Sequence, residues 1–439
     1  MAFRGKAIFT NKDIRNRILF TLFAFLVYRL GSAITVPDVN TADLVAGIED
    51  NSLFAMINLL GGGGLEQFSI FALGVTPYIT ASIIIQLLSM DVVPHLSELA
   101  KNGATGRKTL DKYTRYLAVV FAFVQSFSLV YGFSQTYTTL IEGGVTMAKI
   151  MYIATIFTAG SMFLVWIGDQ ISIKGIGNGI SMVIMAGIVG RMPQQFTDAW
   201  TTLIGVESTI ENGAWLFAGY ILVYLLIIIF VTLINTAERR IPIQYTSSSI
   251  QLSKRSENNY LPLKVNSASV IPVIFASSLM MAPLQIASFF PTNDIIRTMQ
   301  DWLGLRTWYS LVIYVLLILF FTFFYTKMQI NPEKISENLG KSGAYIPSVR
   351  PGTETKNYVN KVLSRITVLG SICLALIAVL PHIMPLIWTD MPTSMALGGT
   401  GMIIVVGVAI ETVRQVQGLI TQKSYKKYFK NCILEKVVL

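Results

Sequence analysis

Side chains that could carry out catalysis or bind a metal are few and scattered in this 439-residue chain. It has two cysteines, Cys373 inside an apolar run and Cys432 near the C-terminus, and two histidines far apart in sequence. This set supplies neither a disulfide framework nor a Cys/His metal site. His382 is followed by Met384 and Pro385, and no convincing Ser or paired-Asp motif accompanies it. An intramembrane protease is therefore a weaker alternative function than a secondary transporter. The sequence predicts no catalytic residue, no metal site and no cofactor.

Two stretches come nearest to a nucleotide-binding loop, which needs the pattern G-x-x-x-x-G-K-[ST] so that backbone N–H groups can cradle phosphates. Gly340-Lys341-Ser342 has Ile335 where the first glycine belongs, and residues 103–109 have the wrong spacing. Neither is a credible ATP site, so the energy for any transport must come from elsewhere.

The candidates for functional ionisable groups within the apolar stretches are Arg29, and Glu411 with Arg414 near the end of one stretch. Secondary transporters usually carry paired ionisable groups near the membrane midplane. Glu411 and Arg414 are three residues apart on one helix face, which favours a local ion pair. A secondary transporter with inverted repeats remains the alternative function.

The most informative element is the hydrophobic segment 61–93, which contains four consecutive glycines, then Gly74-Val75-Thr76-Pro77, then a run rich in isoleucine. Helices that cross hydrocarbon keep their backbone groups bonded internally, and chains interrupt them where the backbone faces protein or a watery cavity. The segment therefore predicts a broken helix beside a pathway through the protein.

Composition indicates a polytopic membrane protein. The chain is 53% hydrophobic and 13% charged, whereas soluble domains carry about 25% charged residues. The fifth predicted span is the weakest because Gly190, Arg191 and Pro193 interrupt its apolar run, and we expect it to line something polar. Ten stretches are candidates to cross about 30 Å of hydrocarbon: 18–36, 71–93, 116–133, 150–167, 180–189, 215–234, 269–290, 308–325, 366–388 and 395–410.

Lysine and arginine are concentrated in every second loop between the predicted spans. This pattern predicts the orientation of the chain in the membrane, because short basic loops stay cytoplasmic. With the N-terminus inside, 28 of the 34 basic residues fall in cytoplasmic segments. The first apolar run is too long for a signal peptide, so we expect a retained helix. Both termini are predicted to be cytoplasmic.

Two basic cytoplasmic loops, 235–268 and 326–365, are longer than turn-making requires. They either enforce topology alone or form a docking surface for an acidic partner such as rRNA phosphate or an acidic protein face. Their length favours docking.

A short pattern recurs in two predicted spans of opposite direction. Residues 77–82 and 272–277 both read Pro-x-Ile-x-Ala-Ser. Such an echo can arise by chance, but it fits inverted repeats with interrupted helices at the centre. We therefore predict an all-α membrane bundle of ten transmembrane helices in two pseudo-symmetric halves of five, residues 1–205 and 206–439, the second ending in a cytoplasmic tail, 411–439.

Five stretches in order carry a family resemblance that covers essentially the whole chain. They are Ser69–Leu88, Gly175–Ser181, Leu263–Ser277, Ser342–Gly352 and Gly398–Thr400. With these motifs the chain resembles the SecY protein-translocation channel of bacteria. The resemblance implies the central pore subunit of the general secretory translocon, in the cell inner (plasma) membrane, rather than an enzyme.

The resemblance also implies a pore closed by aliphatic side chains and a short plug helix at about 61–73. An aliphatic constriction dewets when empty and offers no hydrogen bonds that a passing residue must match. The expected ring residues are Ile79, Ile83, Ile184, Ile188, Ile274 and Ile404. The expected plug residues include Gly64, Leu65, Phe68, Ile70 and Phe71.

A lateral gate between the second and seventh spans is the family's route for signal sequences to intercalate and for transmembrane segments to exit. Polar residues at this seam would let the spans separate at modest cost, since interhelical hydrogen bonds in membranes average about 0.6 kcal/mol. The expected gate residues are Thr80, Ser82, Gln86, Asn266, Ser277 and Ser278.

The partners that the resemblance implies are SecE-like and SecG-like small membrane subunits, a SecA-type motor ATPase, the ribosome, and signal sequences with their unfolded substrates. The loop residues expected to meet motor or ribosome are Arg107, Lys108, Arg239, Arg240, Lys254, Arg255 and Arg350. The chain departs from the family pattern at 103–110, where a second arginine more often follows Arg107, and at the serine-rich stretch 244–259.

Overall fold

The computed structural model describes residues 11–39, 61–90, 92–136, 140–141, 144–204, 213–245, 260–287, 302–303, 307–387 and 399–437. Helices dominate these residues. In chain order they are α2 (Lys12–Ala33), α5 (Thr76–Leu88), α6 (Pro94–Lys101), α7 (Gly103–Thr136), α8 (Met147–Lys174), α9 (Gly179–Ile204), α10 (Gly213–Thr236), α11 (Ile271–Ala287), α13 (Trp308–Gln329), α14 (Pro332–Lys341), α15 (Thr353–Ile387) and α16 (Gly399–Val437).

Among the described residues, six helical stretches are long and apolar enough to cross a membrane, and the chain is a multi-pass membrane protein. The stretches are Thr105–Gln135, Met147–Lys174, Gly213–Thr236, Trp308–Lys341, Thr353–Leu380 and Gly401–Thr421. Shorter apolar helices lie at Thr76–Leu88 and Ile271–Met281. A helix lies at each of the ten predicted apolar stretches, but the number of membrane crossings stays a prediction.

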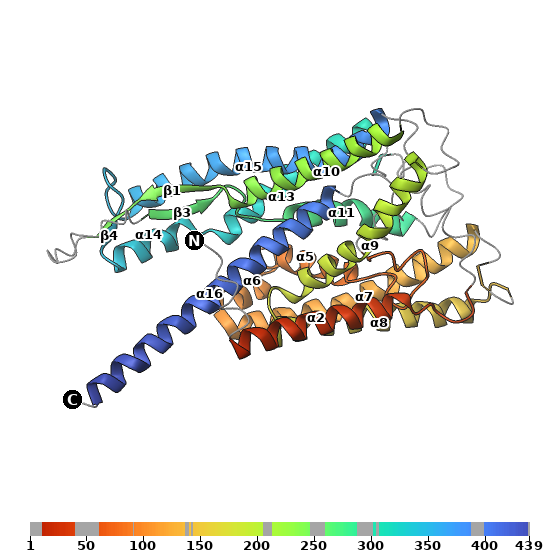
Figure 1. Ribbon diagram of the computed structural model, residues 1–439, viewed down its shortest axis with the longest axis horizontal. Helices are drawn as coiled ribbons and strands as arrows, with labels where there is room; N and C mark the ends of the chain where they lie inside the picture. Colours follow the sequence, from red (N-terminus) through yellow and green to blue (C-terminus); the bar gives the residue numbers. More distant parts are fainter. Residues whose placement is uncertain are drawn as a thin grey trace.

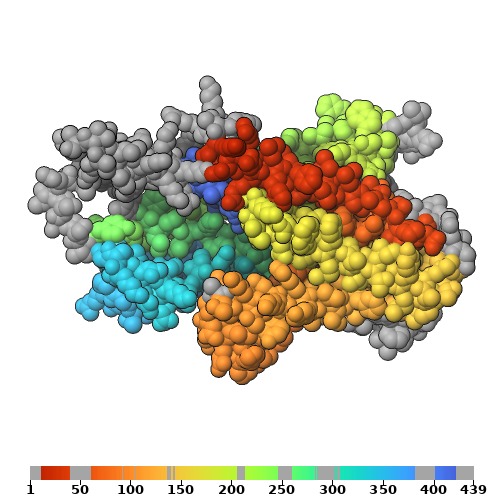
Figure 2. All heavy atoms as spheres, turned by 90° about the horizontal axis from the view of Figure 1, so that it is seen from below, coloured from red at the N-terminus to blue at the C-terminus, as the bar shows by residue number. Residues whose placement is uncertain are grey.

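The helices form two groups with others between them. In Figure 1, α2, α7 and α8 run together on one side, and α10, α13 and α15 run together on the other. Helices α5, α9, α11 and α16 lie between the groups, where α5 contacts α11 and α9 contacts α16. Figure 2 shows the outer face of the first group, with α2 in red beside α8 in yellow. The centre of the molecule is therefore lined by helices from distant parts of the sequence.

The two predicted helix breaks have the same local geometry. Gly74 and Ser269 are both in the left-handed region, with φ of 57° and 55°. Each lies two residues before a helix, and Pro77 and Pro272 are the second residues of those helices. Proline fits the first turn of a helix, where its missing N–H costs nothing. The prolines therefore start α5 and α11 instead of kinking longer helices.

Helix α9 differs from the expectation of a short fifth span. It continues as one helix through Arg191 and Pro193 as far as Ile204. The interruption of the apolar run is thus a change of side-chain polarity, not an end of the helix.

Four short strands are an exception to the all-α prediction. Strands β1 (Glu238–Pro242) and β3 (Tyr260–Lys264) pair antiparallel within the first long basic loop. Strand β2 (Gln244–Tyr245) pairs with β4 (Ala344–Tyr345), which belongs to the second loop. Apolar side chains from both loops pack into a small core of their own, which buries Ile241, Leu263, Ile346 and Val359. Sequence periodicity missed these strands because each is five residues or fewer.

Candidate functional site

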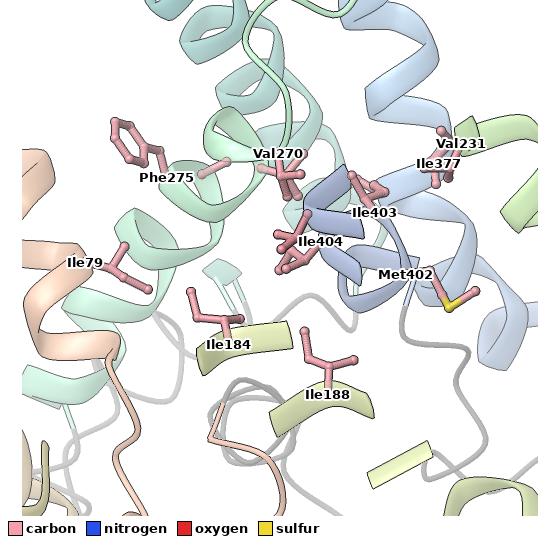
Figure 3. Close-up of a cluster of buried hydrophobic side chains, with 14 of the residues drawn as sticks. Ile79, Ile184, Ile188, Val231, Val270, Phe275, Ile377, Met402, Ile403 and Ile404 are labelled. Carbon is pink, nitrogen blue, oxygen red and sulfur yellow. The ribbon is translucent and has the colours of Figure 1, made fainter. Parts of the chain in front are cut away.

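The six predicted ring isoleucines meet in one apolar cluster at the centre of the molecule. Five of them are buried, with exposed fractions of 8% or less, and Ile274 is half-buried against the same cluster. Figure 3 shows Ile184 and Ile188 of α9 pointing toward Ile404 of α16, with Ile79 of α5 reaching in from the side. Helices that are far apart in sequence thus supply the aliphatic side chains of the predicted constriction.

A polar cavity of about 280 Å³ lies directly against this constriction. Ile184, Ile274 and Ile404 line its apolar part. Its polar lining comes from α9, α10, β3, α11, α13 and α16 and their flanking loops: Asn178, Ser181, Asn235, Lys264, Asn266, Ser267, Ser269, Tyr325, Gln329, Glu411 and Arg414. Three of the six isoleucines therefore lie where a polar cavity meets the apolar core.

Lys264 and Arg414 bring two positive charges to the cavity, together with the carboxylate of Glu411. The pKa of Lys264 is lowered, first because its surroundings desolvate the ammonium and then because Arg414 adds a like charge. Glu411 acts in the opposite direction on the same pKa. Arg414 also donates a hydrogen bond of 3.4 Å from Nη2 to the Asn235 carbonyl, which ties α16 to α10. The expected local pair of Glu411 and Arg414 is not among the ion pairs of the described residues.

The predicted plug, at about 61–73, lies within a run of turns over residues 61–75, so the expectation of a short plug helix is wrong. Gly62, Gly63, Phe68 and Gly74 all have positive φ, a conformation that an α-helix cannot include. The segment is held instead through its backbone. The Val36 N–H donates to the Phe68 carbonyl at 3.0 Å.

Aromatic packing fixes the middle of the turn segment. Leu65 and Phe68 are fully buried, and the Phe68 ring lies 5.8 Å from that of Phe133 on α7 and 5.3 Å from that of Phe157 on α8. Phe71 stacks on Tyr28 of α2 with ring centroids 6.1 Å apart. Gly64 is buried and Ile70 is half-buried.

Sequence reasoning missed several residues that hold the segment. Ser161 Oγ donates to the Gly74 carbonyl at 2.6 Å. A Cβ at Gly160 would collide with the Ile70 carbonyl, so only glycine fits where α8 passes the segment. Tyr28 Oη donates to the Gly61 carbonyl at 3.0 Å. The adjacent Gly160 and Ser161 in an apolar helix are the one signal that could have identified this contact.

Four of the predicted gate residues, Thr80, Ser82, Gln86 and Ser277, bond within their own helices. Thr80 Oγ1 donates to the Thr76 carbonyl at 3.1 Å, and Ser277 Oγ donates to the Ile274 carbonyl at 2.9 Å. Gln86 Nε2 donates to Ser82 Oγ on the same helix at 3.3 Å. Within the described residues, no hydrogen bond joins α5 to α11.

The side-chain amide of Asn266 bonds to α10 and to the turn before α11. Its Nδ2 donates to Asn235 Oδ1 at 2.9 Å and to the Ser269 carbonyl at 3.1 Å. Ser278 Oγ, Gln86 Oε1 and Thr76 Oγ1 are buried without a hydrogen-bond partner. Buried polar atoms without partners make a contact weaker.

The basic loop residues lie on the surface. Arg239, Arg240 and Arg350 are exposed, as are Arg107 and Lys108 at the start of α7. Lys254 and Arg255 lie outside the described residues.

Two neighbours fix the direction of Arg240. Its guanidinium lies 4.7 Å from the Tyr260 ring centroid and makes an ion pair of 2.9 Å with Glu238. The hydrogen bond to Glu238 raises the pKa of Arg240. The first loop thus presents Arg240 from a strand rather than from a disordered chain.

Comparison with known proteins agrees with this geometry. The family model described as SecY matches residues 69–413. The chain belongs to the SecY family. It is 43% identical over 431 residues to protein translocase subunit SecY 1 of Lactobacillus kefiranofaciens subsp. kefiranofaciens, with 97% of this chain and 99% of the relative covered. It is 41% identical over 422 residues to protein translocase subunit SecY of Staphylococcus epidermidis, with 96% and 97% covered.

Solved structures share the SecY-family fold at low sequence identity. A structure described as a protein conducting channel aligns with a TM-score of 0.65 and 17% identity over 92% of both chains. A structure described as the canine ribosome-channel complex with Sec61 aligns with a TM-score of 0.62, 17% identity and the same coverage. The same values hold for a SecY structure whose plug domain is described as stabilising the closed state of the translocation channel and maintaining a membrane seal.

Proposed function

We propose that this chain is the central pore-forming subunit of the general secretory translocon of a cell inner (plasma) membrane. Unfolded secretory polypeptides would cross through the isoleucine ring, and transmembrane segments would leave sideways between α5 and α11. The observation that carries the proposal is the aliphatic constriction with a polar cavity on one side. A dewetted ring of this kind blocks ions without specific ligands.

The turn segment fits the role of a plug despite its lack of helix. It is a compact piece of backbone that packs beside the ring, and few of its side chains reach solvent. Its contacts with α2, α7 and α8 suit a closed channel at rest. The related SecY structure with a plug domain described as a membrane seal supports this role.

The α5–α11 seam fits a lateral gate. Both helices are short and apolar, they start after matched breaks, and no hydrogen bond joins them within the described residues. The matched breaks also support inverted repeats and ten spans in two halves, with both termini cytoplasmic.

The joined basic loops are proposed as the docking surface for the motor ATPase and the ribosome. Arg239, Arg240 and Arg350 would meet acidic or phosphate groups there, and clustered cations steer such partners. The solved relative in a ribosome-channel complex supports a ribosome partner. SecE-like and SecG-like subunits are proposed to cover part of the apolar outer surface.

Photocrosslinking tests the proposal most directly. A secretory chain stalled in transit should be trapped by photoreactive probes at Ile83, Ile188 or Ile274, and a probe on the outer face of α10, at Leu222, is the control. Labelling of the stalled chain from Leu222 alone would contradict the pore.

Ion leak gives a second test. Ile188→Asn should let water into the ring and raise resting ion leak about tenfold. A tenfold rise corresponds to lowering the free energy of the conducting state, relative to the closed state, by about 1.4 kcal/mol. Leu222→Asn on the exposed face is the matched control. An Ile188→Asn channel as tight as the unsubstituted channel would remove Ile188 from the ring.

A further inference from the structure

Glu66 of the plug and Arg191 of α9 form an ion pair through Glu66 Oε1 and Arg191 Nη2. We propose that this pair is specificity-determining: it retains the plug against α9 and so sets how strong a signal sequence must be to open the channel. The inference rests on the proposed function. These two charged residues would thus determine which signal sequences can open the closed channel.

The pair is well shielded from solvent. The side chains of Arg191 and Glu66 are only 16% and 13% exposed. Salt screens such a pair much less than it screens a pair on the surface. Since an exposed ion pair is worth little, this low exposure is what makes the contact strong enough to influence a conformational equilibrium.

The pair is coupled to the ring through a single helix. Arg191 follows Ile188 by three residues, so both lie on the same side of α9. One residue before Ile188, Gly187 packs against the plug backbone at Gly62, and a Cβ on Gly62 would lie 2.6 Å from the Gly187 Cα and collide with it. The start of the plug is therefore seated directly on a ring helix.

Loss of the plug would leave a charge in an unfavourable place. Arg191 Nη1 is buried and has no hydrogen-bond partner in the described part of the chain. Without the Glu66 carboxylate, the guanidinium would lose the counter-charge that offsets its burial. The seated plug is thus favoured by an interaction that breaks when the plug moves away from α9.

A strong signal sequence supplies enough binding free energy at the gate to break the pair, whereas a weak one does not. Substrate discrimination would then depend on the difference between these two energies. Removing the pair should admit weak signal sequences while the ring itself stays intact.

The test uses the full-length chain in membrane vesicles with its membrane partners. Glu66→Gln keeps the size of the side chain and removes its charge, and Arg191→Gln does the same on α9. We expect each to raise resting iodide leak about tenfold and to increase export of a reporter with a shortened apolar signal sequence. The charge exchange Glu66→Arg with Arg191→Glu should restore both values toward those of the unsubstituted chain.

A matched control removes an ion pair elsewhere. Asp169→Asn breaks the 2.8 Å pair between Arg115 and Asp169, which joins α7 to α8 and does not touch the plug. We expect no rise in leak from it at an equal amount of folded protein. Equal leak from Asp169→Asn and Glu66→Gln, or no recovery in the charge exchange, would overturn the inference.

The outcome separates this inference from the proposed function. If Ile188→Asn leaks and Glu66→Gln does not, the pair has no role in selection, although the pore stands. If a stalled chain cannot be crosslinked from the ring, the pore itself is wrong.

Discussion

The contact between α5 and α11 differs sharply from the contact between α9 and α16. The first has no hydrogen bond across it in the described residues, and it leaves Ser278 Oγ and Thr76 Oγ1 buried without partners. At the second, the N–H of Gly177, in the turn just before α9, donates to Gln415 Oε1 at 3.0 Å, and Thr412 Oγ1 donates to Met182 Sδ at 3.5 Å. The α9–α16 side is therefore joined by hydrogen bonds, whereas the α5–α11 contact is held by packing alone.

Under the proposed function, this difference predicts which of the two contacts opens. Both contacts join an early helix to a late helix, so any separation of the two groups must loosen one of them. The α5–α11 contact has the lower cost, because separating it breaks no hydrogen bond and lets water reach polar atoms that are unpaired when it is closed. The α9–α16 contact would then be the hinge side of the proposed gate.

The largest expected effect comes from a covalent bridge across the α5–α11 contact, compared with the same bridge across the α9–α16 contact. Cysteines at Thr80 and Ser277, joined by a short thiol crosslinker, should abolish translocation, and a long crosslinker should restore it. Cysteines at Met182 and Thr412, joined in the same way, should leave most translocation intact. Export of a reporter by vesicles measures both, and normal export through the short α5–α11 bridge would refute the comparison.

Gly177→Ala should destabilise the hinge side. Gly177 has φ of 89°, and a Cβ there would lie 3.0 Å from Met182 Cγ. The left-handed backbone alone costs a residue with a Cβ about 1–2 kcal/mol. Chemical unfolding of the full chain in detergent measures this loss. Gly418→Ala is the control, since nothing lies within 4 Å of a Cβ at this helical position, and alanine there should be neutral or stabilising.

Gln415→Ala tests the hydrogen bond across the hinge side alone. The loss should be about 1 kcal/mol, the usual net value of one hydrogen bond, seen as a lower unfolding midpoint in denaturant. Gln417→Ala on the same helix serves as the comparison. An equal change in both variants would show that the bond to Gly177 adds nothing.

Ser278→Ala probes the other side and should have the opposite sign. Removing a buried hydroxyl without a partner should be neutral or stabilise the closed contact by up to about 1 kcal/mol. The same unfolding measurement applies, together with export of a weak signal sequence, which should fall. A clear loss of stability would mean that Ser278 has a partner when the contact is closed.

The smallest effect concerns pH. Because the pKa of Lys264 is lowered, the folded chain binds fewer protons than the unfolded chain between that pKa and the usual lysine value of about 10.4. Stability contributed by this group therefore rises with pH across that window and is constant below it. Lys264→Gln should flatten the rise in an alkaline unfolding series, and an unchanged slope would exclude Lys264 as its source.

Sequence was enough to place the helices, because apolar stretches and the recurring Pro-x-Ile pattern are local signals. The six ring residues are expected from the family resemblance instead, and their role stays a prediction. Sequence also located the break before Pro77, where Gly74 needs a left-handed backbone. It could not give the turn fold of the plug, which depends on Ser161 and Tyr28, distant residues that bond its carbonyls. Nor could it show that Asn266 bonds toward α10, since that choice depends on where Asn235 lies.

The pairing of β2 with β4 makes the two basic loops one mechanical unit. Under the proposed function, a force that a docked partner applies to either loop would act on both loops. Through α10 and α15 that force would reach the helices on the far side from the plug. The pairing is only two residues long on each strand, and the shared core of Ile241, Leu263, Ile346 and Val359 holds the loops together beside it. Under the proposed function, these two contacts would set how much force a docked partner can apply before the loops separate.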